Sequence, residues 1–174
     1  MGVWSSKQKV SVLVIGLDNS GKTTLINKLK PEGTGAREIA PTVGFSVDAF
    51  SQYDIDFDVF DMSGQGRYRN LWDYYYKDVG AIMFVIDTAD KLRMCVVKDE
   101  LDAMLRNADV PRVPILFFAN KMDLPQAFSR VECAQILKLE EIRDKPWQII
   151  SSNALTGEGL DEGIAWLAER CKAA

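Results

Sequence analysis

The stretch Gly16-Leu17-Asp18-Asn19-Ser20-Gly21-Lys22-Thr23 directly follows the apolar run Val10-Ser11-Val12-Leu13-Val14-Ile15. A continuous β-branched run predicts a buried parallel strand and residues 23–29 predict a helix, so the two glycines lie at a strand-to-helix turn. That context is typical of a P-loop, in which backbone N–H groups and the helix dipole surround phosphate oxygens. Lys22 would bring positive charge to the outer phosphates, and the Thr23 hydroxyl could ligate Mg²⁺. The alternative is a glycine-rich connector that binds nothing.

The rest of the chain alternates strands with helices. Further strands are expected over 45–53, 55–60, 81–87, 114–119 and 147–150, and further helices over 92–105, 131–137 and 160–171. This order predicts an α/β fold with a mostly parallel, doubly wound six-stranded sheet. One antiparallel hairpin strand is expected across Tyr53-Asp54, with helices on both faces of the sheet. Ligands of such sheets bind outside the carboxyl ends of the strands, where the polar motifs lie.

Two of these polar motifs follow predicted strands. Asp61 ends the second hairpin strand and precedes Met62-Ser63-Gly64-Gln65-Gly66, which suggests a carboxylate aimed at a metal beside a flexible loop. Asn120-Lys121-Met122-Asp123 ends a later strand, and the Asp123 carboxylate could accept hydrogen bonds from N1–H and N2–H₂ of guanine, which adenine cannot offer there. A site of this kind supports discrimination on the order of 10⁴. Alone, this motif would be read as a polar turn, but a P-loop about a hundred residues upstream favours guanine recognition.

Composition restricts the protein class. The 174 residues fit one domain, expected over 10–174 after an arm at 1–9, and we expect a monomer. A net charge of −4 offers no electrostatic reason to bind nucleic acid. Three widely spaced cysteines and no histidine favour a reduced, cytoplasmic compartment without a zinc site. We expect neither a transmembrane helix nor a signal peptide.

The N-terminus carries a possible lipidation signal. Met1-Gly2-Val3-Trp4-Ser5-Ser6 fits the pattern for N-myristoylation of Gly2 after removal of Met1. The alternative is an untethered start. With Gly2 acylated, the protein would bind a membrane surface peripherally.

The motifs together resemble a small GTPase of the Ras superfamily over nearly the whole chain. They are Gly16 to Thr23, Pro41-Thr42, Asp61-Met62-Ser63-Gly64-Gln65, Asn120-Lys121-Met122-Asp123 and Ser152-Asn153-Ala154. Asp18, Pro41-Thr42-Val43-Gly44-Phe45 and Tyr68-Arg69-Asn70-Leu71-Trp72 are similar to the Arf-like branch. Asp61 to Arg69, with Leu92-Arg93-Met94, resembles the members linked to the BBSome, a coat complex at the base of cilia and flagella.

The resemblance implies a site for GTP or GDP with Mg²⁺. Lys22 would contact the β- and γ-phosphates, Thr23 and Thr42 would ligate Mg²⁺, and Asp61 would hold a Mg²⁺-bound water. The Gly64 amide would sense the γ-phosphate, and Gln65 would orient the attacking water, so Gln65 and Lys22 are the expected catalytic residues. Asn120 would tether its loop and reach guanine N7, the Lys121 stem would cover the purine, and the Ala154 amide would read O6. The full nucleotide-binding set would be Gly16, Asp18, Asn19, Ser20, Gly21, Lys22, Thr23, Thr24, Thr42, Gly64, Asn120, Lys121, Asp123 and Ala154.

The resemblance also implies a switch that is read by partners. Hydrolysis should be slow, because no arginine occupies an obvious finger position and Asp18 would place negative charge near the β–γ bridge; a GAP-supplied finger can be worth about 10³ to 10⁵ in rate. An exchange factor (GEF) would reload the protein with GTP. Phe45, Phe60 and Tyr75, with Trp72 close by, would form the surface for a GTP-state effector, a BBSome subunit by resemblance. For any one of these aromatics alone, burial in the core is the simpler reading.

Three departures and two alternatives accompany this interpretation. Ser63 replaces a glycine usual in the Arf family and is expected to stiffen switch two, the loop after Asp61. Asn153-Ala154-Leu155 departs from the usual Ser-Ala-Lys. We expect the roughly nine residues before the first strand to be too few for the long amphipathic helix of Arf proteins. A P-loop kinase or ATPase would need an acceptor pocket or lid, for which the chain offers neither length nor histidines. A pseudo-GTPase scaffold is disfavoured by the intact phosphate, metal and glutamine positions.

Overall fold

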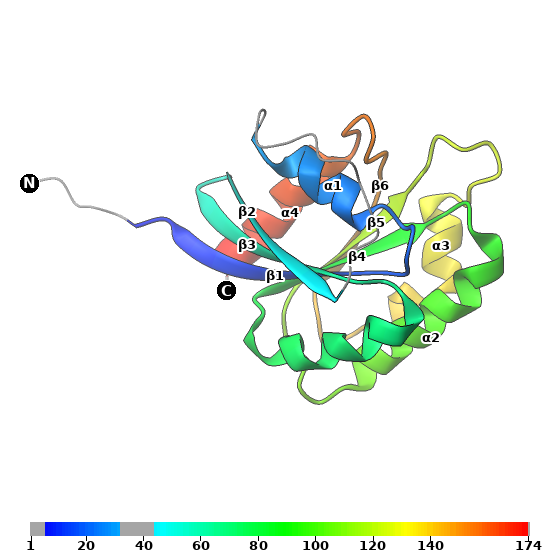
Figure 1. Cartoon of the computed structure of the whole chain (residues 1–174), viewed down its shortest axis with the longest axis horizontal. Coiled ribbons are helices and arrows are strands. Elements are labelled where there is room, and N and C mark those ends of the chain that lie inside the picture. The colour runs from blue at the N-terminus through cyan, green and yellow to red at the C-terminus, as the bar shows by residue number, and fades with distance from the viewer. Residues whose placement is uncertain (1–5, 32–43, 174) are drawn as a thin grey trace, which may run out of the picture.

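The computed structural model describes residues 6–31 and 44–173. Its centre is one six-stranded sheet in the order β2-β3-β1-β4-β5-β6 (Figure 1). Only β2 runs antiparallel to its neighbour, β3, and the remaining pairs are parallel. The predicted sheet, including its hairpin, is therefore confirmed. The strands are β1 (Gln8–Ile15), β2 (Phe45–Gln52), β3 (Ile55–Met62), β4 (Ala81–Asp87), β5 (Ile115–Asn120) and β6 (Trp147–Ser151).

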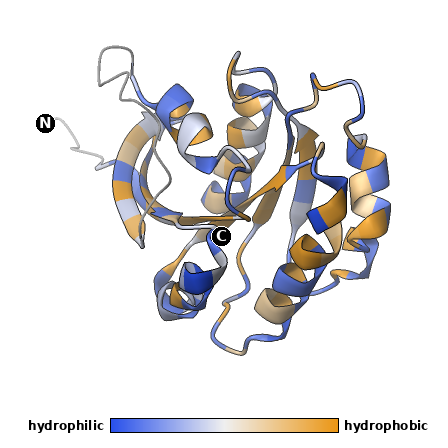
Figure 2. Ribbon diagram, turned by 45° about the vertical axis from the view of Figure 1, so that its right-hand side comes forward, coloured by the Kyte–Doolittle hydropathy of each residue, from blue (hydrophilic) through white to orange (hydrophobic). Residues whose placement is uncertain are grey.

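Helices cover both faces of this sheet, as predicted. Those of one face are α1 (Lys22–Leu29) and α4 (Leu160–Lys172), and those of the other are α2 (Met94–Arg106), α3 (Arg130–Ile136) and the 3₁₀-helix η1 (Gly66–Asp78). Two short 3₁₀ turns, η2 (Lys91–Arg93) and η3 (Leu139–Glu141), complete the described elements. Figure 2 shows the central strands as mostly hydrophobic, whereas the helices around them carry both hydrophobic and hydrophilic residues.

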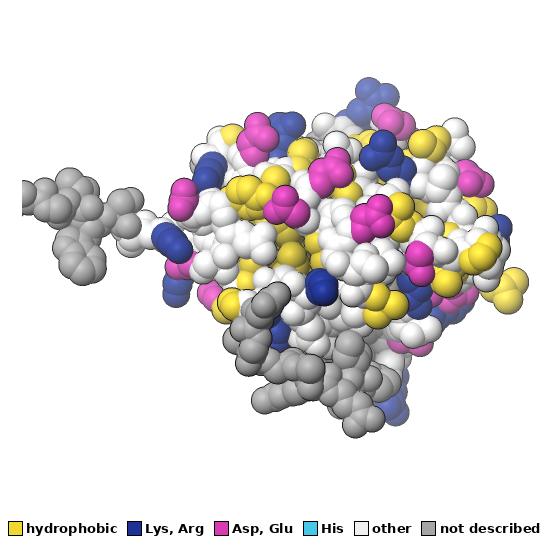
Figure 3. Space-filling model, turned by 90° about the horizontal axis from the view of Figure 1, so that it is seen from above, with side chains coloured by type: hydrophobic (Ala, Val, Ile, Leu, Met, Phe, Trp, Pro, Cys, Tyr) yellow, Lys and Arg dark blue, Asp and Glu magenta, His cyan; other side chains and the backbone are white. Residues whose placement is uncertain are grey.

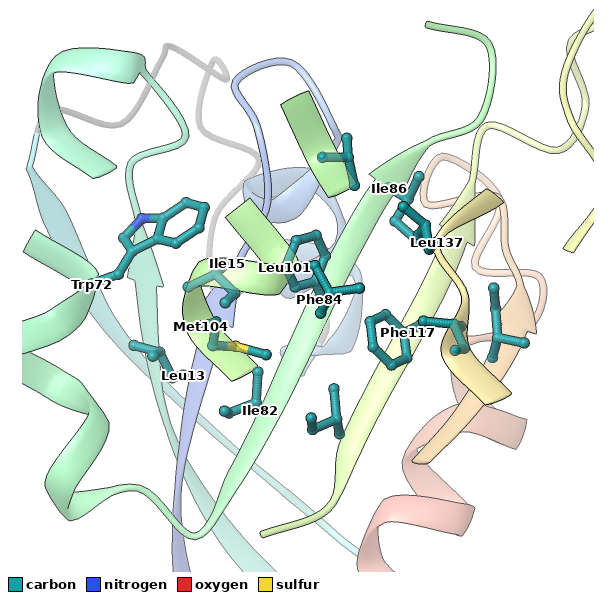
Figure 4. Packing of buried hydrophobic residues seen from close by; sticks show 14 of the residues in the cluster. Leu13, Ile15, Trp72, Ile82, Phe84, Ile86, Leu101, Met104, Phe117 and Leu137 are labelled. Atoms are coloured by element: carbon teal, nitrogen blue, oxygen red, sulfur yellow. The ribbon is translucent and has the colours of Figure 1, made fainter. Parts of the chain in front are cut away.

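Each face of the sheet has its own core. Leu25, Ile26 and the apolar face of α4 pack on one side, against side chains such as Val12 and Val14 of β1. Leu13 and Ile15, the alternate residues of β1, point to the other side, where Figure 4 shows Leu101 and Met104 of α2 beside them. Strands β4 and β5 are buried almost throughout, because helices cover both of their faces.

The edge strand β2 is different. Of its residues only Phe50 is buried, and Phe45, Val47 and Ala49 are exposed. The hairpin turn is formed by Tyr53 and Asp54, both in the left-handed conformation with φ of 53° and 58°. This two-residue turn with positive φ matches the twist of the paired strands, which explains why the hairpin closes there without glycine.

Several predicted details need correction. Leu92 was expected on the apolar face of the helix but lies in η2 and is 92% exposed; the helix begins at Met94, and Val97 provides the buried position instead. Strand β3 continues one residue beyond Asp61, and β1 begins at Gln8, inside the predicted arm. Helix η1 was not predicted at all.

The surface mixes charges of both signs. On the face shown in Figure 3, acidic and basic side chains alternate with apolar ones over the described part of the chain. Among the described helices, none combines the length and apolar character needed to cross a bilayer.

Candidate nucleotide-binding site

The loop between β1 and α1 encloses the Lys22 side chain. Its ammonium donates hydrogen bonds to the carbonyl oxygens of Gly16 (3.0 Å) and Leu17 (2.9 Å) and to the hydroxyl of Ser20 (3.4 Å). Burial lowers the pKa of Lys22 to about 8, a shift that the carboxylates of Asp61 and Asp18 oppose. Desolvated and positively charged, this group is suited to receive an anion, and an anion beside it would raise its pKa again.

Two glycines let the loop pass close to other backbone. A Cβ on Gly16 would lie 2.3 Å from the Val85 carbonyl oxygen, and a Cβ on Gly21 would lie 2.4 Å from Asn120 Nδ2. Both residues have positive φ, 149° and 101°. The sequence therefore needs glycine at these positions for the strand-to-helix turn that was predicted as a P-loop.

A pair of oxygen ligands lies at the end of this loop. The Thr23 hydroxyl donates to Asp61 Oδ2 over 2.6 Å, and Asp61 is fully buried. Strand β3 pairs with β1 in a register that places Asp61 opposite Val14, near the carboxyl end of β1. The loop that leads to Thr23 begins at this end, so Thr23 and Asp61 meet at the same edge of the sheet. Hydroxyl and carboxylate oxygens fit the ligand preference of Mg²⁺. The third predicted ligand, Thr42, lies outside the described residues.

The segment after β3 rests against the loop. A Cβ on Gly64 would lie 2.2 Å from the Asp18 nitrogen, so only glycine permits this approach. Arg69 donates to the Gly64 carbonyl (3.1 Å) and forms an ion pair with Glu100 of α2 (2.7 Å). Gln65 is half-buried beside it.

The hydroxyl of Ser63 accepts a hydrogen bond from the Gln65 amide (3.3 Å), and the Ser63 amide donates to the Gly44 carbonyl (2.9 Å). The backbone bond holds this segment to the residue before β2, and any non-proline residue at position 63 could make it. Only the bond from the Gln65 amide depends on the serine hydroxyl, and the stiffening expected from Ser63 stays a prediction.

A pocket opens where the predicted guanine motif meets the loop. Its centre is organised by Asn120, which is 2% exposed. Asn120 donates to the Ser20 carbonyl (2.9 Å) and accepts from the Ser152 hydroxyl (3.2 Å) and the Ala154 amide (3.0 Å), so it ties three segments together. These are the bonds expected of a residue that tethers its loop. The pocket is lined by Gly21, Thr24, Asn120, Lys121, Asp123, Leu124, Asn153, Ala154 and Leu155.

Other members of the motif lie around this pocket. The Lys121 ammonium donates to the Asn19 carbonyl (2.7 Å) and to Asp87 (2.9 Å), which fixes its stem beside the pocket. Asp123 is exposed, with its carboxylate open to a ligand. Contact of the Ala154 amide with guanine stays a prediction, because that amide donates to Asn120 here.

Sequence reasoning missed two acidic–basic contacts at this site. Asp87, the partner of Lys121, had been treated only as the end of a strand. Asp18 was expected to add uncompensated negative charge near the β–γ bridge, but its carboxylate forms an ion pair with Arg93 over 2.6 Å. Neither pairing has a local sequence pattern, although an acidic residue closing a buried strand could have flagged Asp87.

Three of the four predicted effector-surface aromatics form one cluster. Tyr75 contacts both Phe45 and Phe60, with ring centroids 5.1 and 5.7 Å apart. Phe45 is 43% exposed, whereas Phe60 and Tyr75 are half-buried and also pack on the core. Trp72 was wrongly assigned to this surface: it is 1% exposed, lies among core side chains (Figure 4) and donates its indole N–H to the Ser63 carbonyl (3.0 Å).

Comparison with known proteins agrees with this geometry. The model of the ADP-ribosylation factor family matches residues 1–171. ADP-ribosylation factor-like protein 6 of Danio rerio is 57% identical over 169 residues, covering 96% of this chain and 91% of that protein. The Caenorhabditis elegans protein of the same name is 43% identical, covering 93% and 86%.

A solved structure is similarly close. The Arl6 BBS3 small GTPase from Trypanosoma brucei, with the bound nucleotide analogue GppNp, superposes with a TM-score of 0.88 at 45% identity, covering 95% of this chain and 99% of that one. These matches set aside the kinase and pseudo-GTPase alternatives. The chain therefore belongs to the ADP-ribosylation factor family, whose members are small GTPases that bind guanine nucleotides, hydrolyse GTP and work with GEFs, GAPs and effectors.

Proposed function

We propose that the GTP-bound form of this GTPase recruits a BBSome-like membrane coat for the transport of ciliary or flagellar membrane proteins. Support comes from the resemblance of Asp61 to Arg69 and of Leu92-Arg93-Met94 to the coat-recruiting branch, and from 57% identity to ADP-ribosylation factor-like protein 6 of Danio rerio. The observation that carries the proposal is the contact cluster of Phe45, Phe60 and Tyr75, which adjoins the segment expected to sense the γ-phosphate.

The phosphate end of the site provides the switching chemistry. Lys22 and the loop amides would hold the β- and γ-phosphates, and Thr23, Thr42 and, through water, Asp61 would hold Mg²⁺. Mg²⁺ would supply charge neutralisation on the phosphate oxygens. Gln65 would orient water for attack on the γ-phosphorus, giving GDP and inorganic phosphate. With Arg93 engaged by Asp18, hydrolysis should be slow until a GAP supplies an arginine.

Guanine would occupy the pocket around Asn120. The exposed Asp123 carboxylate would accept both N1–H and N2–H₂ and be desolvated by the base. The Lys121 stem, fixed at both Asn19 and Asp87, would cover the purine face. The Ala154 amide already donates to Asn120 Oδ1. To contact guanine O6 as well, it would have to share its hydrogen between the two oxygens.

Information would pass from phosphate to partner through a short path. Gly64 touches the loop, and Ser63 links Gly64 to Gly44, one residue before Phe45. A γ-phosphate that repositions Gly64 would thereby shift the backbone beside the aromatic cluster. A partner reading that cluster would discriminate GTP from GDP.

Residues 10–174 would form the GTPase domain, with residues 1–9 as an arm that attaches it to membranes. Myristoylation at Gly2, which lies outside the described residues, would give weak, reversible attachment. Stable residence would then need the coat as a second contact, which fits peripheral membrane localisation facing the cytoplasm near the ciliary or flagellar base.

The test is a pair of titrations on Tyr75→Ala, one with labelled GTP and one with the β-propeller of a BBSome subunit. The GTP-loaded variant should bind the propeller more weakly by about 1 to 3 kcal/mol while keeping its GTP affinity. Tyr53→Ala, at the other end of the hairpin, is the matched control and should bind both normally. Loss of GTP binding by Tyr75→Ala would show that the cluster supports the fold and that the interface lies elsewhere.

A further inference from the structure

Arg93 uses all three guanidinium nitrogens on acceptors near the phosphate loop. Nη1 donates to the Asp18 carboxylate (2.6 Å), Nη2 to the Asp18 carbonyl (2.8 Å) and Nε to the Asp90 carboxylate (2.6 Å). The hydrogen bond that Arg93 donates to the Asp90 carboxylate, and to a lesser degree the one it donates to the Asp18 carboxylate, raises the Arg93 pKa above its ordinary value despite burial. Two of the three nitrogens therefore donate to Asp18 of the phosphate loop, 75 positions earlier in the chain.

Arg93 lies between two helices, but its side chain contacts the loop expected to bind phosphate. It ends η2 and directly precedes α2, which follows the carboxyl end of β4. The carboxylate of Asp18 raises the pKa of Lys22, and the guanidinium of Arg93 lowers it more weakly. Arg93 is the N-cap residue of α2, but its side chain makes no capping hydrogen bond there.

We propose that Arg93 is a positioning residue for the nucleotide, which neutralises Asp18 and fixes the Asp18 carbonyl so that the loop keeps its shape and does not repel the triphosphate. The inference rests on the proposed placement of phosphates in this loop. It assigns Arg93 a role distinct from an arginine finger, because both ends of its guanidinium are already held by acidic partners.

Losing the charge compensation of Asp18 and losing the shape of the loop should affect GTP and GDP binding differently. Without Arg93, the Asp18 carboxylate would face the phosphates uncompensated, and GTP carries one more phosphate than GDP. Loss of charge compensation should therefore weaken GTP more than GDP. Loss of the bond to the Asp18 carbonyl alone would loosen the loop and weaken both nucleotides alike.

The experiment compares dissociation rates of fluorescent GDP and GTP analogues from the full chain. Arg93→Gln should release GTP about tenfold faster and GDP less so, a size set by loss of charge-assisted hydrogen bonds at a half-exposed site. Adding Asp18→Asn to Arg93→Gln should restore most of the GTP retention. Arg93→Lys keeps the positive charge but loses the planar guanidinium that donates to two Asp18 oxygens. It should therefore release both nucleotides faster, with the ratio of the GTP and GDP dissociation rates unchanged.

Lys98→Gln is the control, because it removes a cation from α2, the helix that follows Arg93, and the partner of Lys98 is Asp102, one turn further along that helix. Equal rates for Arg93→Gln and Lys98→Gln would overturn the proposal. So would faster release of both nucleotides without rescue by Asp18→Asn, which would indicate a merely structural role. Failure of the wild type to bind either nucleotide would instead refute the nucleotide site itself.

Discussion

Replacement of Asn120 by alanine tests the architecture of the base pocket. The change removes the donor to the Ser20 carbonyl and the acceptor for the Ala154 amide, and both residues are buried, at 1% and 4% exposure. Each buried polar group left without a partner costs about 1–3 kcal/mol, so the free energy of unfolding should fall by about 2–6 kcal/mol. For a chain of this size that corresponds to a melting temperature lowered by about 4–24 °C.

The assay is thermal unfolding followed by circular dichroism, with nucleotide removed so that ligand binding does not mask the change. Asn107→Ala is the matched control, since its side chain accepts one hydrogen bond, from the Asp109 amide, near the surface. That control should lose about 0.5 kcal/mol or less. If the two variants melted together, the view that Asn120 holds the phosphate loop, β5 and the loop after β6 in place would be refuted.

Three further predictions concern the nucleotide cycle and membrane attachment. Asp123→Asn should weaken GDP binding by several kcal/mol in calorimetric titration, because a charged acceptor of two bonds is lost, and equal wild-type affinity for ADP and GDP would contradict the guanine assignment. Gln65→Leu should retain GTP, because attacking water loses its orienting group, whereas Thr23→Asn should favour GDP or an empty site; chromatography of the bound nucleotide would expose an error if both variants carried the same mixture. Gly2→Ala should move the protein from the membrane to the soluble fraction of cells, and unchanged fractionation would rule out acylation as the anchor.

Local patterns predicted the features that depend on local chemistry. The β-branched run before Gly16 identified β1, and the glycine spacing identified the loop that encloses Lys22. Parallel strands bring their carboxyl ends to one edge of the sheet, which is why the sequence predicts Asp61 beside Thr23.

The wrong predictions concern side chains whose burial depends on tertiary packing. Four aromatic residues within five positions, from Trp72 to Tyr76, suggested a surface, but η1 buries Trp72 and Tyr76 and leaves Tyr74 exposed. The 3₁₀ turn before α2 changes the phase of the helix, which turns Leu92 outward and puts Val97 into the core. The pairing of Arg93 with Asp18 joins residues far apart in the chain, and propensity carries no signal for it.

The proposed function requires that GTP control coat recruitment at a membrane. The most direct measurement is sedimentation of purified BBSome with liposomes that carry the N-myristoylated protein, loaded either with a non-hydrolysable GTP analogue or with GDP. The coat should sediment with liposomes bearing the GTP-analogue form and stay in the supernatant with the GDP form. Equal sedimentation with both forms, or none with either, would contradict recruitment controlled by GTP.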